Sequence, residues 1–234
     1  MALPLYLALT AAEFQKCSRL PEYSAWMACH YSSYAPGLSN IPKQLPKNAM
    51  LTLNDRTPAQ GHDPALILRQ VTELAGILHY KYILLDFQRP DSQENRDVVQ
   101  ALLAEQPCPI GVPPLYANGL DCPVLLPPLP PHVPMGDYLS PWQGREIWLE
   151  TALDAEIITV TESGSSVSSL SSAEVPENSQ ADPALHCHYH IRTYDDRIEF
   201  SLWRTRDDLT DLLQEAESTG VTLAVGLWQE LNQI

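Results

Sequence analysis

The chain has 234 residues, of which 44% are apolar, and its formal net charge is -15. This length and apolar content indicate a globular chain with a sizeable core and are not typical of a disordered one. The negative charge argues against a phosphate-binding surface of clustered lysine and arginine and against docking on anionic lipid. We therefore expect neither a nucleic-acid nor a membrane partner.

The cysteines and the first residues bear on the cellular compartment. The cysteines are odd in number, widely scattered and never arranged as a CxxC pair, which predicts free thiols in a reducing compartment, here the cytoplasm. The start, MALPLYLALTAAEF, has no basic segment before its short apolar run. It predicts a first strand rather than a signal peptide. No apolar run approaches the ~20 residues that span a bilayer.

The first 104 residues alternate buried strands with helices. Asp63 is a natural N-cap before Pro64, and the apolar residues that follow to Leu78 recur at helical spacing. A second helix is predicted over 92–104. Strands that alternate with helices indicate a parallel sheet, and apolar character along the whole strand indicates that both its faces are covered. The predicted strands are 5–10, 25–29, 49–53 and 82–87.

Residues 105–141 are rich in proline. The stretches CPIGVPPLY and CPVLLPPLPPH each begin as an apolar strand and end in a proline pair. Because proline cannot donate to a ladder, each strand must stop there. We interpret these stretches as two short barrel strands followed by rigid loops on one rim. The alternative is a polyproline linker.

The pattern changes again over 145–205. The stretches REIWLETAL, AEIITVTES, HCHYHIRTY and RIEFSLWRT predict antiparallel strands, with a mobile Ser-rich loop over about 163–183. The chain then returns to a helix, RDDLTDLLQEAESTG, and a last strand, VTLAVGLWQEL. The expected fold is therefore α/β: a TIM-type (β/α)8-like barrel, imperfect or with eight strands. It forms one domain over 1–234, with an antiparallel sheet insertion at 145–205.

Function in such a barrel lies at the C-terminal ends of its strands. The polar and aromatic residues there suit a saccharide, because aromatic faces stack on sugar rings and carboxylates flank glycosidic bonds. The sequence has no Gly-rich phosphate loop and no G-x-S-x-G elbow, so no cofactor is expected. The candidate residues are Glu13, His30, Tyr31, Asn54, Asp55, Asp86, Gln88, Arg89, Tyr116 and Trp228.

Three histidines, His186, His188 and His190, alternate along one predicted strand. They would share one face of that strand. The outer two would have Cα atoms ~13 Å apart, too far for one coordination sphere. We therefore predict a solvated sheet face and no metal site; the alternative is an ion shared by a pair such as His188 with His190.

The stretch YILLDFQRP, residues 82–90, resembles the fourth-strand signature of family 18 glycoside hydrolases, the chitinase family. That signature reads Asp-Gly-x-Asp-x-Asp-Trp-Glu-x-Pro, and Asp86, Phe87 and Pro90 match it. The last strand, LAVGLWQEL, is similar to the family's eighth strand, whose final Trp forms the floor of the sugar subsite. The resemblance implies a barrel fold, a saccharide ligand, an orienting role for Asp86 and a stacking role for Trp228.

The departures from the signature concern catalysis. Gln88 stands where the family has its general acid, and Lys81 and Leu84 replace the two earlier aspartates. An amide cannot release a proton near neutral pH, and general-acid help contributes roughly 10²–10⁴ in rate. The resemblance therefore does not imply that the family mechanism operates here.

Three functional hypotheses remain open at this point. The barrel binds a saccharide at its C-terminal rim without the usual acid; or it is an active glycoside hydrolase that uses Asp55 with Asp86, or Glu13; or it binds an unrelated small molecule. A local turn cap is the alternative for Asp55. Arg89 is expected to pair with one of the two aspartates and keep it ionised.

Overall fold

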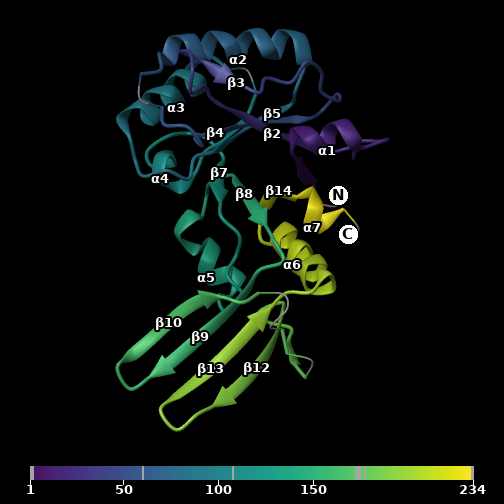
Figure 1. Cartoon of the computed structure of the whole chain (residues 1–234), viewed down its shortest axis with the longest axis vertical. Helices are drawn as coiled ribbons and strands as arrows, with labels where there is room; N and C mark the ends of the chain where they lie inside the picture. The colour runs from purple at the N-terminus through teal and green to yellow at the C-terminus, as the bar shows by residue number, and fades with distance from the viewer. Residues whose placement is uncertain (1–2, 60, 107, 172–174, 177, 233–234) are drawn as a thin grey trace.

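The computed structural model describes residues 3–59, 61–106, 108–171, 175–176 and 178–232, and its larger sheet is built from eight parallel strands (Figure 1). In chain order these are β1 (Leu5–Leu9), β2 (Ser24–Tyr31), β4 (Met50–Asn54), β5 (Tyr82–Asp86), β6 (Ile110–Gly111), β7 (Val124–Leu126), β8 (Ile147–Thr151) and β14 (Val221–Leu227). They are ordered β6-β5-β4-β2-β1-β14-β8-β7. The short β3 (Leu38–Ser39) pairs antiparallel with β2.

A parallel bridge between Val112 and Val124 joins the two ends of this sheet. The Val112 N–H donates to the Pro123 carbonyl at 3.0 Å, and the Leu125 N–H donates to the Val112 carbonyl at 2.9 Å. Pro113 directly follows the bridged residue, so pairing cannot extend further. The predicted TIM-type barrel is confirmed, and YILLDFQRP contributes its fourth parallel strand, as expected.

The helices cover the barrel unevenly. Asp63 caps the longest of them by accepting from the Ala65 N–H at 3.0 Å, and Pro64 is its first residue, as predicted. Several crossings between barrel strands carry only one or two helical turns, which makes the barrel imperfect. In the described part of the chain, no helix is long and apolar enough to cross a bilayer. The helices are α1 (Ala11–Lys16), α2 (Pro64–Leu78), α3 (Gln93–Glu105), α4 (Pro114–Ala117), α5 (Met135–Leu139), α6 (Arg206–Ser218), α7 (Trp228–Leu231) and a 3-10 turn, Ser140–Trp142.

A second, antiparallel sheet projects from the barrel (Figure 1). Part of the Ser-rich segment belongs to it, so the expectation of a mobile loop over 163–183 is wrong for that part; residues 172–174 and 177 lie outside the described chain. Its strands, ordered β10-β9-β13-β12-β11, are β9 (Ala155–Thr161), β10 (Gly164–Ser169), β11 (Gln180–Asp182), β12 (Cys187–Thr193) and β13 (Arg197–Trp203).

The stretch REIWLETAL was expected to be antiparallel, and this expectation is wrong. Its strand, β8, pairs in parallel with β7 on one side and with β14 on the other, as the seventh strand of the barrel. Trp148 and Leu149 are fully buried, because one face of β8 lines the barrel interior and the other packs outward. The division of the chain into one domain with an insertion over 145–205 stays a prediction.

Aromatic rings fill the part of the barrel interior near the N-terminal ends of the strands. The rings of Tyr6 and Tyr82 lie 5.6 Å apart, and those of Tyr82 and Trp148 lie 5.3 Å apart. These residues belong to β1, β5 and β8, which are not neighbours in the sheet, so they meet across the interior. The same buried cluster also contains further apolar side chains, namely Ala25, Met50, Leu84, Leu125, Leu223 and Val225.

Gly226 of β14 is expected to tolerate no side chain. A Cβ there would lie 2.3 Å from Leu231 Cδ1 and 2.5 Å from the Thr151 main-chain oxygen. Gly226→Ala should lower the free energy of unfolding by about 1–3 kcal/mol, because a backbone atom cannot move aside cheaply. Urea unfolding measures this. Gly76→Ala in α2, where a Cβ would meet nothing within 4 Å, is the control and should not destabilise the protein; equal losses would contradict the prediction.

Candidate functional site

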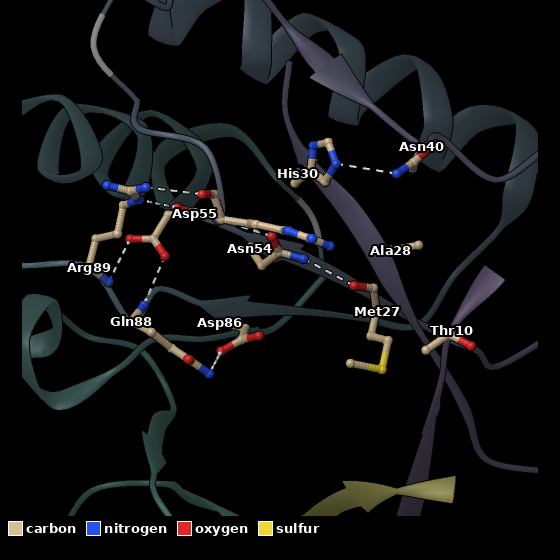
Figure 2. A pocket seen from close by; sticks show the side chains of 11 residues that line it. Thr10, Met27, Ala28, His30, Asn40, Asn54, Asp55, Asp86, Gln88 and Arg89 are labelled. Carbon is tan, nitrogen blue, oxygen red and sulfur yellow. Dashed lines mark hydrogen bonds between the residues drawn. The ribbon is translucent and has the colours of Figure 1, made fainter. Parts of the chain in front are cut away.

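A polar cavity of about 520 Å³ opens at the C-terminal ends of β2, β4 and β5 (Figure 2). The C-terminal ends of parallel barrel strands meet on one rim, which explains why residues far apart in the chain gather there. The sequence predicted six of the residues that line it, namely His30, Asn54, Asp55, Asp86, Gln88 and Arg89. It missed Thr10, Met27, Ala28, Asn40 and Arg56.

Asp55 is the most enclosed carboxylate of this cavity, with 2% of its surface exposed. Its two oxygens accept from the Gln88 N–H at 2.9 Å, the Arg89 N–H at 3.1 Å and the Asn95 amide at 3.2 Å (Figure 2 shows the first two bonds). The carboxylate therefore fixes the loop after β5 against the end of β4. With both oxygens engaged in this way, Asp55 is poorly placed to act as a proton donor or nucleophile.

Arg89 does not use its guanidinium for the expected ion pair. Its Nε donates to the Asp55 main-chain oxygen at 2.9 Å, and its terminal nitrogen donates to the Arg56 main-chain oxygen at 3.2 Å. It is the backbone N–H of Arg89 that contacts the Asp55 carboxylate. The expectation that the Arg89 side chain pairs with an aspartate is therefore wrong. The guanidinium instead holds the backbone that follows β4.

Asp86 and Gln88 form a pair at the tip of β5. The Gln88 amide donates to Asp86 Oδ1 at 2.8 Å (Figure 2). Burial raises the pKa of Asp86 above its usual value; the Gln88 hydrogen bond lowers it in part, and the charge of Asp55 raises it further. The net shift is upward, so Asp86 holds a proton more readily than an exposed aspartate does.

The remaining polar lining residues are held by local hydrogen bonds. The His30 ring contacts the Tyr31 carbonyl at 2.9 Å and the Asn40 amide at 3.2 Å. The Asn54 amide donates to the Met27 carbonyl at 3.0 Å. These bonds orient the side chains before any ligand arrives, which lowers the entropy cost of binding.

Two predicted rim aromatics lie in the core. Tyr31 is fully buried and Tyr116 is 2% exposed. The Tyr31 hydroxyl donates to Asn95 Oδ1 at 3.0 Å, and the Asn95 amide donates to the Tyr116 hydroxyl at 3.2 Å. Neither ring lines the cavity, so the structure gives no support to ligand stacking on them. Asn95 of α3 thus connects the hydroxyls of both rings to the Asp55 carboxylate. The sequence analysis did not identify Asn95 as a residue of this network.

Glu13 and Trp228 also lie outside the cavity lining. Glu13 completes a capping box at α1, where its carboxylate accepts from the Thr10 N–H and hydroxyl, both at 2.8 Å. Burial raises the pKa of Glu13, but the Thr10 hydrogen bonds outweigh this, and the net shift is downward, which disfavours a proton-donor role. Trp228 is the first residue of α7. Its role as a sugar floor stays a prediction.

A second cavity, of about 360 Å³, lies at the mouth of the barrel interior. It shares Met27, Asp86 and Gln88 with the first cavity and adds Glu150 from β8. Burial, and after it the negative charge of Asp86, raise the pKa of Glu150 to about 7. The sequence analysis missed Glu150. The available signal was a lone acid two residues after Trp148, at the C-terminal end of an apolar run.

The histidine-rich strand differs from its prediction. His186 has a left-handed backbone, with φ of 47°, and precedes β12 instead of sharing its face. It contacts Glu215, whereas His188 contacts Asp208 at 2.9 Å. Among the described residues, no group of three or more His, Cys, Asp or Glu side chains is arranged to hold a metal ion.

Comparison with known proteins shows that this chain is similar in structure to several solved proteins. No protein-family model matches the chain, and no curated protein matches its sequence. A class V chitinase from Nicotiana tobaccum has 10% identity and a TM-score of 0.61 over 97% of this chain and 93% of its own. A GH18 chitinase variant from Cycas revoluta, in complex with (GlcNAc)4, has 11% identity and a TM-score of 0.58 over 99% and 96%.

A third similar structure is the spore cortex-lytic enzyme SleL from Bacillus cereus, at 10% identity and a TM-score of 0.56 over 96% of this chain and 70% of that one. Identities this low establish likeness of fold alone. The match nevertheless extends over nearly the whole chain in all three cases, so it includes both the barrel and the projecting sheet. The chain thus has the α/β-barrel fold of the family 18 chitinases, to which it bears a distant structural resemblance.

Proposed function

We propose that this barrel binds a saccharide at its C-terminal rim, with Asp86 as an orienting residue and without a general acid at position 88. The observation that carries the proposal is the 520 Å³ cavity, which collects oriented carboxylate, amide and imidazole groups at the strand ends. Such groups recognise sugar hydroxyls, because each can donate or accept a hydrogen bond in a fixed direction.

The similar structures support an oligosaccharide as the ligand class. A Glu-to-Gln variant of the Nicotiana tobaccum class V chitinase was solved in complex with NAG4. A barrel of this fold thus holds a sugar tetramer while one of its glutamates is an amide. Gln88 is compatible with binding for the same reason: its amide already contacts Asp86 and leaves its carbonyl oxygen free to accept from a sugar.

We also infer a cytoplasmic location for the protein. All five cysteines are free thiols, and Cys29, Cys122 and Cys187 are buried. Burial raises the pKa of the Cys29 thiol to about 12, so it stays protonated and unreactive. Cell fractionation with thiol labelling tests this inference, and recovery of the chain outside the cytoplasm would contradict it.

Binding of the N-acetylglucosamine tetramer, measured by titration calorimetry, tests the proposed function. The unmodified protein should bind it, and Asp86→Ala should weaken binding by about tenfold or more, because a hydrogen bond to a charged group contributes roughly 1.5–3 kcal/mol. Tyr194→Ala, an exposed aromatic on the projecting sheet, is the control and should leave affinity unchanged. Absence of binding by the unmodified protein would contradict the proposal.

A further inference from the structure

Asp86 and Glu150 face the same cavity for a simple geometric reason. Side chains two residues apart on a strand point to the same face. Leu84 and Trp148 belong to the buried cluster inside the barrel, so Asp86 and Glu150, two residues further along β5 and β8, lie one layer nearer the mouth. Both line the 360 Å³ cavity above that layer.

The two carboxyl groups have different surroundings. Burial raises the pKa of Asp86, and the hydrogen bond that Asp86 accepts from the Gln88 amide lowers that pKa in part. Glu150 faces Asp86, and burial together with that charge raises its pKa to about 7. Tyr138, whose pKa is raised by burial and then by the charge of Glu150, is the other titratable group that faces it. Among the described lining residues there is no lysine or arginine.

We propose that Glu150 and Asp86 are the general acid and the general base of a glycoside hydrolase centre in this cavity, which replaces the acid absent at position 88. The proposal rests on saccharide binding at the rim. Glu150 transfers its proton to the glycosidic oxygen as the bond from that oxygen to C1 breaks. Asp86 takes a proton from a water molecule, whose oxygen forms the new bond to C1 with inversion. One water is consumed, and later proton exchange with solvent restores both carboxyl groups.

Two substrates with different leaving groups test whether Glu150 acts as the general acid. The substrates are β-glycosides of chitotriose with phenol, which needs a proton to leave, and with dinitrophenol, which does not. Glu150→Gln should lower kcat for the phenyl glycoside by about 10²-fold or more and should affect the dinitrophenyl glycoside much less. Asp86→Asn should lower kcat for both. For the unmodified enzyme, kcat should fall as the pH rises through about 7, where Glu150 loses its proton.

The controls separate this proposal from the binding proposal. Glu162→Gln, on an exposed turn of the projecting sheet, should leave kcat unchanged. Calorimetry on Glu150→Gln should still detect the chitin tetramer, which shows that the variant is folded. Binding without any turnover by the unmodified protein would overturn the acid–base pair and leave the binding proposal intact; no binding would overturn both. Turnover that survives Glu150→Gln, or a product of retained configuration, would overturn the pair alone.

Discussion

Asp55→Ala is expected to lower the free energy of unfolding by about 3 kcal/mol or more. The Asp55 carboxylate accepts from two backbone N–H groups and from the Asn95 amide, and it is 2% exposed. Alanine would leave these three donors without their acceptor. A buried donor without a partner costs about 1–3 kcal/mol, so the loss should approach the sum of more than one such cost.

Urea unfolding, followed by circular dichroism, measures this change. Asp63→Ala is the matched control, because Asp63 caps α2 at the surface through one bond, to the Ala65 N–H. Loss of such a cap costs about 1 kcal/mol. If Asp55→Ala destabilises no more than Asp63→Ala does, Asp55 does not anchor the β5 loop. Because that loop carries Gln88, tetramer binding should weaken in Asp55→Ala even where the protein is folded.

Trp148→Ala should lower the free energy of unfolding by about 3–5 kcal/mol, the usual range for removal of a buried tryptophan. The side chain is fully buried in the barrel interior, where its ring contacts Tyr82. Its indole fills the space beside Gly111, where a Cβ would lie 2.3 Å from the ring. The barrel wall is hydrogen-bonded on both sides of β8 and cannot collapse to fill the gap.

Trp142→Ala provides the comparison for this substitution. Trp142 is half-buried in the 3-10 turn, so its loss opens no enclosed cavity and should cost less. Thermal and urea unfolding of the two variants measure the difference. Equal losses would mean that the barrel interior repacks around the missing indole, contrary to the expectation from its rigid wall.

Local patterns predicted most of the barrel. Helix α2 was predictable because its N-cap, first proline and apolar stripe are all encoded within one stretch of chain. The strand from Tyr82 to Asp86 was predictable from its apolar run. The pairing of β8 was not, because a short run of three apolar residues, Ile147 to Leu149, looks alike in parallel and antiparallel ladders. Its partners β7 and β14 are chosen by packing between segments that lie up to about a third of the chain apart.

The candidate site divides in the same way. Asp86 and Gln88 are two residues apart, so the sequence alone brings them together at one strand tip. The burial of Tyr31 and Tyr116 was missed, since both are bonded to Asn95, 64 and 21 residues away respectively. A strand end shows which residues are near the rim but not whether a side chain turns into the cavity or into the core.

The sequence by itself determined the parallel barrel, the place of YILLDFQRP as its fourth strand and the amide at position 88. These features depend on periodicity, caps and residue identity, which are local. Only the tertiary structure decided that the Asp55 carboxylate holds the loop after β5 against the end of β4. It also decided that Glu150 faces Asp86 across the barrel mouth. The pKa of a carboxyl group depends on burial and on charges brought near it by folding, and neither is encoded in its sequence neighbours.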